Sequence, residues 1–244
     1  MAAADRPDEL HPGSEDLDGA DHPCAVLLHE AANGRFPPAD GNVEFFAPDD
    51  FGTCAAVGFT GHAVVLTPPG PRPERPSAPF GFGGVHEPNF LLSLAGPGGE
   101  LGSLDVVLVA RGTGRAGPTE RSPERLTETD AHDRHPRVLR ARSHRRHVRV
   151  LGDERGLVAI GVGLVGRTEL SVELTGAAPG RGVGRQLIRG GLAAVGRGQL
   201  VFAQVAAGNA ASLRAFLACG FVPVASEVLI VRATPDADRR IEDR

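Results

Sequence analysis

The 244-residue sequence contains no lysine, no tryptophan and no tyrosine, so all 26 of its basic residues are arginines. The absence of lysine excludes a Walker A phosphate loop, which requires one. The absence of tyrosine excludes a phenol as a catalytic acid. Because 30 acidic residues give a formal net charge of −4, a general nucleic-acid-binding protein is also disfavoured.

Cysteine is scarce, and long apolar runs are missing. Cys24, Cys54 and Cys219 lie far apart and form no C-x-x-C pair, so we predict neither a disulfide framework nor a zinc site. No apolar run reaches the roughly 18 residues of a membrane span. The acidic N-terminus lacks the basic start and apolar segment of a signal peptide. We expect a cytoplasmic protein that has no metal and no membrane partner.

Composition divides the chain into regions. Residues 1–23 and 233–244 are predicted to be disordered tails, and the first of them is acidic. Residues 24–103 are expected to form an N-terminal α/β subdomain. Residues 104–232 are predicted to form the main domain, with its clearest signal in a core at 147–232.

Apolar periodicity in the core predicts the order β-β-β-α-β-α-β, an α/β (α+β) class with a mixed sheet flanked by helices. Asn209 and Gly220 are suited to cap the second of these helices. The predicted elements are strands at 147–154, 157–167 and 168–175, a helix at 183–195, a strand at 200–207, a helix at 209–219 and a strand at 221–231. Ahead of the core we expect helices at 25–33 and 89–96 and strands at 43–46, 62–67 and 104–111.

The segment GAAPGRGVGRQLI, residues 176–188, places glycines and arginines where the first core helix must begin. A helix start carries unpaired amides and positive dipole character, and glycine lets an anion approach them closely. The segment therefore predicts an anion cradle, with a simple glycine-rich turn as the alternative. GVGLVG at 161–166 matches the dinucleotide pattern GxGxxG, but the period-two run RTELSVEL follows it, and a dinucleotide fold requires a helix there.

The segment GRGVGRQLI, the strand at 200–207 and then GNAASLRAFLACGF together resemble the GNAT superfamily of acetyl-CoA-dependent N-acetyltransferases, in a bacterial type with an extra N-terminal region. The resemblance implies a largely antiparallel mixed sheet and acetyl-CoA as co-substrate. It covers residues 147–232, and reaches 104–232 if the strand at 104–111 is the family's first strand.

The resemblance also assigns roles to residues. The coenzyme pyrophosphate would be bound by main-chain amides of Gly180, Arg181, Gly182, Val183, Gly184 and Arg185. The strands at 168–175 and 200–207 would splay apart, main-chain groups around Val172 and Leu174 would bind the pantetheine arm, and Asn209 would contact the coenzyme. The family pattern is broken at Pro179, where it has Gln or Arg, and at Phe216, where it often has a Tyr that protonates the departing thiolate.

Amine acetylation requires a base, because an amine with a pKa near 10 is charged at pH 7. Period two puts Glu169, Ser171 and Glu173 on one face of their strand. We predict Glu169 as the base, with burial raising its pKa, and Glu173 as an aid to amine binding; a solvent-facing face is the alternative. Gln204 and Glu227 are candidates for the same cleft.

Residues 132–150 hold seven arginines and four histidines, and a solvated helix face paired with acids is the favoured interpretation. The sequence thus predicts an N-acetyltransferase that acts on a small-molecule or peptide amine and that could form a homodimer. A non-catalytic acyl-CoA-binding regulatory module is the first alternative. A nucleic-acid-associated protein that uses the basic stretch is the second.

Overall fold

The computed structural model describes residues 21–49, 51–70, 73, 75–114, 126–175 and 182–232. The predicted tails lie almost entirely outside these ranges, as do Pro179, Gly180 and Arg181. None of the helices in the described ranges is long and apolar enough to cross a membrane.

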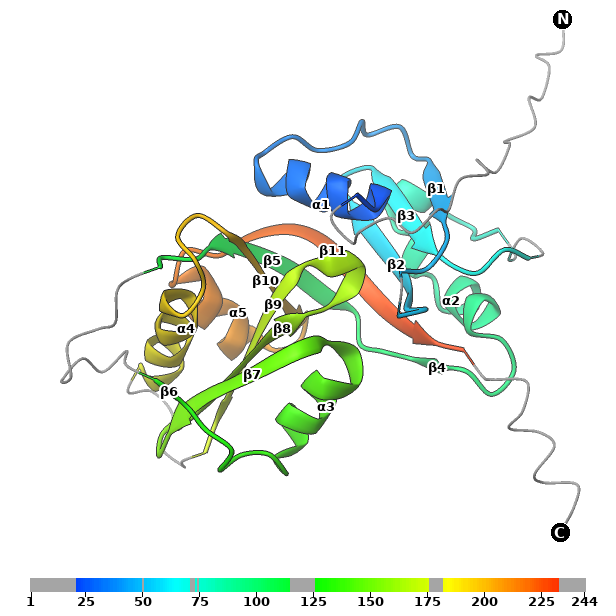
Figure 1. Cartoon of the computed structure of the whole chain (residues 1–244). Coiled ribbons are helices and arrows are strands. Elements are labelled where there is room, and N and C mark those ends of the chain that lie inside the picture. Colours follow the sequence, from blue (N-terminus) through cyan, green and yellow to red (C-terminus); the bar gives the residue numbers. More distant parts are fainter. Residues whose placement is uncertain are drawn as a thin grey trace, which may run out of the picture.

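One mixed sheet organises the described chain, in the order β1-β3-β2-β11-β5-β10-β9-β8-β7-β6, with β4 paired to β11 (Figure 1). Only the β1–β3 and β9–β10 pairs are parallel. The strands are β1 (Val43–Phe46), β2 (Cys54–Phe59), β3 (His62–Leu66), β4 (Glu100–Leu101), β5 (Asp105–Arg111), β6 (Thr127–Glu128), β7 (Arg146–Asp153), β8 (Gly156–Val162), β9 (Thr168–Leu174), β10 (Leu200–Ala206) and β11 (Val222–Val231). The predicted class, a largely antiparallel mixed sheet flanked by helices, is confirmed.

Helices cover both faces of the sheet. They are α1 (Pro23–Ala32), α2 (Pro88–Ala95), α3 (Pro136–His144), α4 (Val183–Ala193) and α5 (Ala210–Leu217), with single 3-10 turns at Phe80–Phe82, Gly84–His86 and Leu164–Gly166. α1 packs on the face that carries Val107 and Phe202, here called the α1 face, and α3 covers the same face further along. α4 and α5 pack on the opposite face around Leu108 and Leu170.

The predicted β-β-β-α-β-α-β order of the core is confirmed by β7, β8, β9, α4, β10, α5 and β11. The chain also forms β9 directly after GVGLVG, so that pattern is not a dinucleotide site. Packing explains why residue 163 of this pattern is a glycine, because a Cβ atom at Gly163 would lie 2.3 Å from the carboxyl carbon of Glu169.

The strand predicted at 104–111 forms, but it does not stand beside β7 as a first strand of the core would. β5 is inserted between β10 and β11, and it pairs antiparallel with both along its length. The N-terminal strands continue the same sheet, since β2 pairs with β11 from Cys54 to Gly58. Consequently the start of β5 lies beside the end of β10, which brings Asp105 opposite Ala206.

Candidate functional site

β9 and β10 run parallel but pair at a single position, Glu169 with Phe202. Beyond it the two strands part, as the family resemblance implies, leaving a gap between Ser171–Leu174 and Ala203–Ala206 that is called the wedge here. Main-chain groups of β9 that face β10 in the wedge therefore lack a strand partner on that side. Val172 and Leu174, the predicted pantetheine contacts, lie on this part of β9.

The helix α4 begins beside the end of β9. Its N-cap is Gly182, with φ of 76°, a left-handed conformation that favours glycine. Glycine has no side chain with which to cap the first amides, those of Val183, Gly184 and Arg185. Arg185 folds back, so that its guanidinium lies 3.3 Å from where a Gly182 Cβ would stand.

No packing in the described part of the chain requires glycine at Gly184. Among the described residues, a Cβ atom there would meet only the Leu174 Cδ1 atom, at an ordinary contact distance of 4.0 Å. Gly191 in the same helix is different, since its Cβ would lie 2.5 Å from a Leu170 methyl carbon. The free space beside Gly184 is thus at the helix start, next to the end of the wedge.

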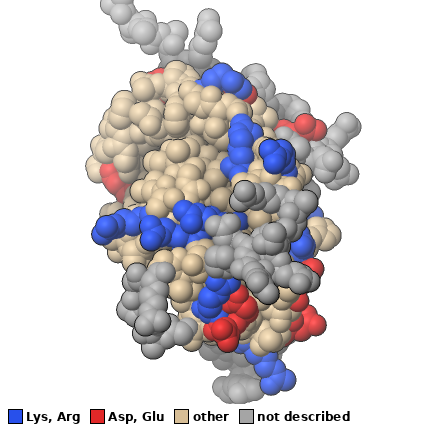
Figure 2. Space-filling view, turned by 90° about the vertical axis from the view of Figure 1, so that its left-hand side faces the viewer, with Lys and Arg blue, Asp and Glu red and all other residues tan. Residues whose placement is uncertain are grey.

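Positive charge surrounds this helix although the chain carries a net charge of −4. Figure 2 shows blue side chains spread across the face that lies on the left of Figure 1, where α4 is found. All of them are arginines, because the chain has no lysine, and Arg185 and Arg189 of α4 are exposed. Such a surface attracts a polyanion such as a diphosphate.

On the α1 face, buried charges line the wedge. Glu169, with its side chain 7% exposed, accepts hydrogen bonds from Arg167 Nε at 2.8 Å and Arg145 Nε at 2.7 Å. Arg145 also donates to Ser171 Oγ at 3.1 Å and to Gln204 Oε1 at 3.4 Å, so its side chain spans the wedge from β9 to β10. Arg167 Nη2 donates to Glu227 Oε1 at 2.7 Å.

The pKa of Glu169 corrects one expectation. Burial by itself would raise that pKa, as we predicted, but the charges and hydrogen bonds of Arg167 and Arg145 outweigh burial and lower it. A carboxylate held in its charged form is a weak base. The role of Glu169 as the base stays a prediction, and this arrangement disfavours it. Glu173 lies on the same face, as predicted, and its carboxylate pairs with Arg137 of α3 at 3.0 Å.

The turn that supplies Arg167 is strained. Val165 has φ of 48° and ψ of 36°, a left-handed conformation that is rare for a β-branched residue. Its amide donates to Asp49 Oδ2 at 3.0 Å, and its side chain is buried. Strain that the surroundings enforce is typical of functional sites. Here it holds Arg167 between two carboxylates.

Three buried polar atoms beside the wedge have no hydrogen-bond partner among the described residues: Arg167 Nη1, Gln204 Nε2 and Glu227 Oε2. Buried polar groups are nearly always paired, so each unpaired one requires an explanation. They lie on three separate segments that meet on the α1 face. The arrangement is typical of a polar site prepared for a ligand.

Other predicted residues have structural partners. Asn209 caps α5, because its Oδ1 accepts from the Ser212 amide at 3.1 Å. Phe216 is buried and packs edge-to-face on Phe221, with ring centroids 4.9 Å apart. Cys219 is half-buried rather than buried, and its thiol lies 3.5 Å from the Arg185 carbonyl oxygen. The basic stretch is only partly the solvated helix face that we favoured, because α3 ends at His144, β7 follows, and the Arg145 side chain is only 9% exposed. Its arginines do pair with acids as expected, for example Arg142 with Asp133 at 2.7 Å.

Sequence reasoning missed Asp105 and His144. Burial raises the pKa of Asp105, while burial and then the charge of Arg140 lower that of His144. Both belong to segments whose position over the wedge depends on the sheet order, which no local pattern reports. The Arg167–Glu169 pair could have been predicted from the sequence, because residues two apart in an extended segment share a face.

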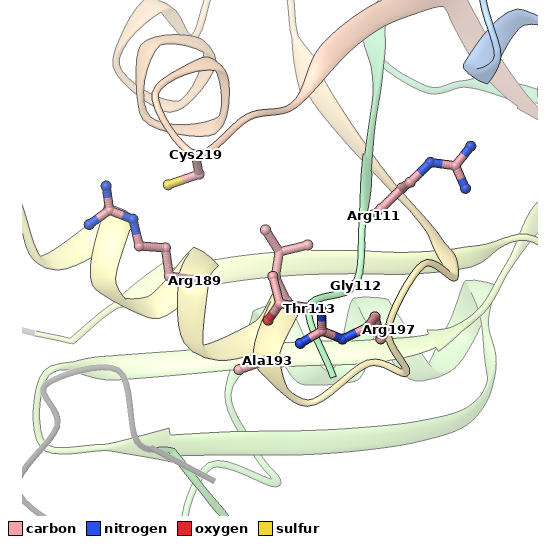
Figure 3. Close-up of a pocket in the computed structure, with 8 residues that line it drawn as sticks. Arg111, Gly112, Thr113, Arg189, Ala193, Arg197 and Cys219 are labelled. Atoms are coloured by element: carbon pink, nitrogen blue, oxygen red, sulfur yellow. The ribbon is translucent and has the colours of Figure 1, made fainter. Parts of the chain in front are cut away.

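A separate pocket of about 650 Å³ lies at the far end of α4, about 15 Å along the helix from Gly182. Figure 3 shows Arg189 beside Cys219 at one side of it and Arg197 beside Thr113, whereas Arg111 points away. Arg111 donates to the Gly198 carbonyl and to Asn33 Oδ1. Among the described residues no cluster of three His, Cys, Asp or Glu side chains could hold a metal ion.

Three similar solved structures are acetyltransferases. The chain is similar to a GNAT-family acetyltransferase from Novosphingobium aromaticivorans, with a TM-score of 0.40 and 19% identity over 57% of this chain and 69% of that one. It is also similar to a GNAT-family acetyltransferase from Colwellia psychrerythraea (TM-score 0.35, 8% identity, 55% and 57% covered) and to a GCN5-related N-acetyltransferase from Kribbella flavida (0.33, 14%, 58% and 63%).

No family model and no curated protein matches the sequence. The likeness to solved structures is partial at these scores. The function proposed next therefore rests on the geometry of the chain itself.

Proposed function

We propose that this protein is an N-acetyltransferase that moves an acetyl group from acetyl-CoA to a primary amine by direct transfer. The observation that carries the proposal is the wedge. Two neighbouring parallel strands, β9 and β10, pair only at Glu169 and Phe202 and then part, and an uncapped helix start lies at the end of β9.

The coenzyme fits this arrangement in two parts. Its pyrophosphate binds the amides of Val183, Gly184 and Arg185, assisted by the Arg185 guanidinium that folds over Gly182. Its pantetheine arm lies in the wedge and pairs with the strand edge of β9, as an added peptide strand would. Gly180 and Arg181 remain predicted contacts of the pyrophosphate, and Asn209 of the coenzyme.

Within the wedge the acetyl carbonyl faces the α1 face, where the buried charges and the unpaired polar atoms are. The acceptor amine attacks the carbonyl carbon in its neutral form, so a proton must first be removed. The thiolate that leaves is protonated through water. Phe216, at the position of the family's tyrosine, has no hydroxyl and is buried against Phe221.

One alternative has support of its own. Phe216 in place of a phenol and the ionised Glu169 are both consistent with a non-catalytic module that binds acyl-CoA and regulates another protein. Such a module would use the same wedge and the same helix start. The regulatory module would differ from the enzyme only in that it transfers no acetyl group to an amine.

The test measures binding and turnover separately. Calorimetry with acetyl-CoA gives affinity, and release of free thiol in the presence of an amine panel gives transfer, with the amine-free rate subtracted. Saturable binding with amine-dependent thiol release supports the enzyme. Saturable binding without it supports the regulatory module, and no binding contradicts both.

A further inference from the structure

Asp105 and Glu227 stand directly opposite each other on β5 and β11. Opposed residues of antiparallel strands point to the same face with Cβ atoms about 5 Å apart. Phe202 lies on the α1 face and pairs with Val109 of β5. Val107 and Asp105 are two and four positions from Val109 on the same strand, so Asp105 also points to the α1 face. The two carboxyl groups therefore form a pair beside the open end of the wedge, where Asp105 is also opposite Ala206 of β10.

The two carboxyl groups differ in burial and partners. Glu227 is 1% exposed, and its Oε2 has no hydrogen-bond partner among the described residues. Asp105 is half-buried and accepts a bond from Ser103 Oγ at 2.7 Å. Burial raises the pKa of both, and the nearby Asp105 charge raises that of Glu227 further.

The cations that face Asp105 come from two segments. Arg140 and Arg137 of α3 and Arg167 of the strained turn lower the Asp105 pKa, but burial outweighs them. Arg137 is at the same time bound to Glu173 of β9, and Arg140, three residues further along α3, lies on the same side of that helix.

Arg140 differs from its neighbours on α3. Arg137 pairs with Glu173 and Arg142 pairs with Asp133, but Arg140 has no ion-pair partner in the described part of the chain. Its guanidinium is exposed, and its charge acts on Asp105. An exposed cation thus acts on a half-buried carboxylate that lies opposite Ala206, at the end of β10.

Resting on the function proposed above, we propose that Asp105 receives the acceptor's ammonium group and removes a proton from it, while Arg140 holds an anionic group of the same acceptor. The acceptor class is then a primary amine with a carboxylate close to it, as in an amino acid. Glu227 supports the site as a positioning residue, because it stands directly opposite Asp105 and its Oε1 accepts the hydrogen bond from Arg167 Nη2 at 2.7 Å.

The proton balance is simple. Asp105 takes one proton from the ammonium group, and the freed nitrogen lone pair attacks the thioester carbon. The carbon–sulfur bond breaks and its electron pair leaves on the coenzyme sulfur. The second nitrogen proton passes through water to that thiolate, and Asp105 returns its proton to solvent. No oxidant, reductant or further co-reactant is needed.

The test uses the full-length protein, acetyl-CoA and a matched acceptor series: amino acids, their carboxamides, and amines without a carboxylate. The variants are Asp105→Asn, Arg140→Met and, as a control acid in an exposed ion pair, Glu128→Gln. Asp105→Asn should bind acetyl-CoA within about twofold of the wild type, lose at least about 100-fold in kcat/KM, and lose the rise of kcat/KM with pH. Arg140→Met should raise KM for amino acids about 10-fold and leave carboxamides unchanged, and Glu128→Gln should match the wild type.

Three results overturn the inference, each in its own way. An Asp105→Asn variant that keeps the wild-type rate and pH profile, or that loses only melting temperature, excludes the base. A wild type that acetylates amines but prefers the carboxamides excludes the acceptor class. A wild type that does not bind acetyl-CoA at all removes the proposed function itself.

Discussion

Replacement of Gly184 by alanine should raise the stability of the protein and weaken its binding of acetyl-CoA. Helix positions favour alanine over glycine by about 0.5–1 kcal/mol. Among the described residues the new methyl group meets only the Leu174 Cδ1 atom, at 4.0 Å, so packing against them does not offset this gain. For a chain of this size the variant should melt about 1–4 °C higher than the wild type.

Binding should change in the opposite direction. The added methyl group lies at the helix start, where the pyrophosphate must approach the amides of Val183 and Gly184. A loss of at least about 1.4 kcal/mol, or tenfold in the dissociation constant of acetyl-CoA, is expected from calorimetry. Gly70→Ala is the control, because Gly70 is exposed, a Cβ there meets only one atom at 4.0 Å, and its loop is remote from the wedge.

Two results would refute this reasoning. A Gly184→Ala variant less stable than the wild type would mean that the glycine is needed by the fold. A more stable variant with unchanged affinity would mean that the coenzyme does not approach this helix start. Stability gained together with affinity lost is the outcome that the structure predicts.

Three further predictions concern the rest of the molecule. Arg167→Met should lower the free energy of unfolding by about 3–5 kcal/mol in urea titrations, because it leaves buried carboxylates without their cation, and a loss below 1 kcal/mol would contradict the buried network. The hydrogen bond from His62 lowers the pKa of Asp40 to about 2. The ionised Asp40 carboxylate therefore stabilises the fold above its ordinary pKa of 3.8, and this contribution is lost as the pH falls towards 2. Over that range the melting temperature should fall less steeply in Asp40→Asn than in the wild type. Cys24, whose pKa burial raises to about 12, should resist thiol reagents at pH 8 while the half-buried Cys219 reacts first, and equal rates would contradict the described burial.

Local sequence patterns were enough to predict most elements of the core. The apolar periodicity predicted α4, and Asn209 and Gly220 predicted the two ends of α5. Both signals depend only on residues that are close together in the sequence. The run CAAVGF, residues 54–59, was missed as a strand. Its small residues carry little β-propensity, and it forms β2 because β3 and β11 pair with it on both sides.

The candidate site was less predictable, since its charges come from segments far apart in the chain. The shared face of Glu169 and Glu173 could be predicted from the period-two pattern, and the family resemblance implied that β9 splays from β10. The lowered pKa of Glu169 could not be predicted from burial alone, because it depends on the charges and hydrogen bonds of Arg167 and of Arg145, which enters from the end of α3. Asp105 could not be predicted as a site residue, because its place at the wedge depends on β5 lying between β10 and β11.

The most direct test of the account is a structure of the protein with coenzyme A, supported by a calorimetric titration of the same ligand. We expect saturable binding, with diphosphate oxygens on the amides of Val183, Gly184 and Arg185 and the pantetheine arm between β9 and β10. No heat of binding, or a coenzyme bound elsewhere with the wedge closed by Arg145, would contradict it.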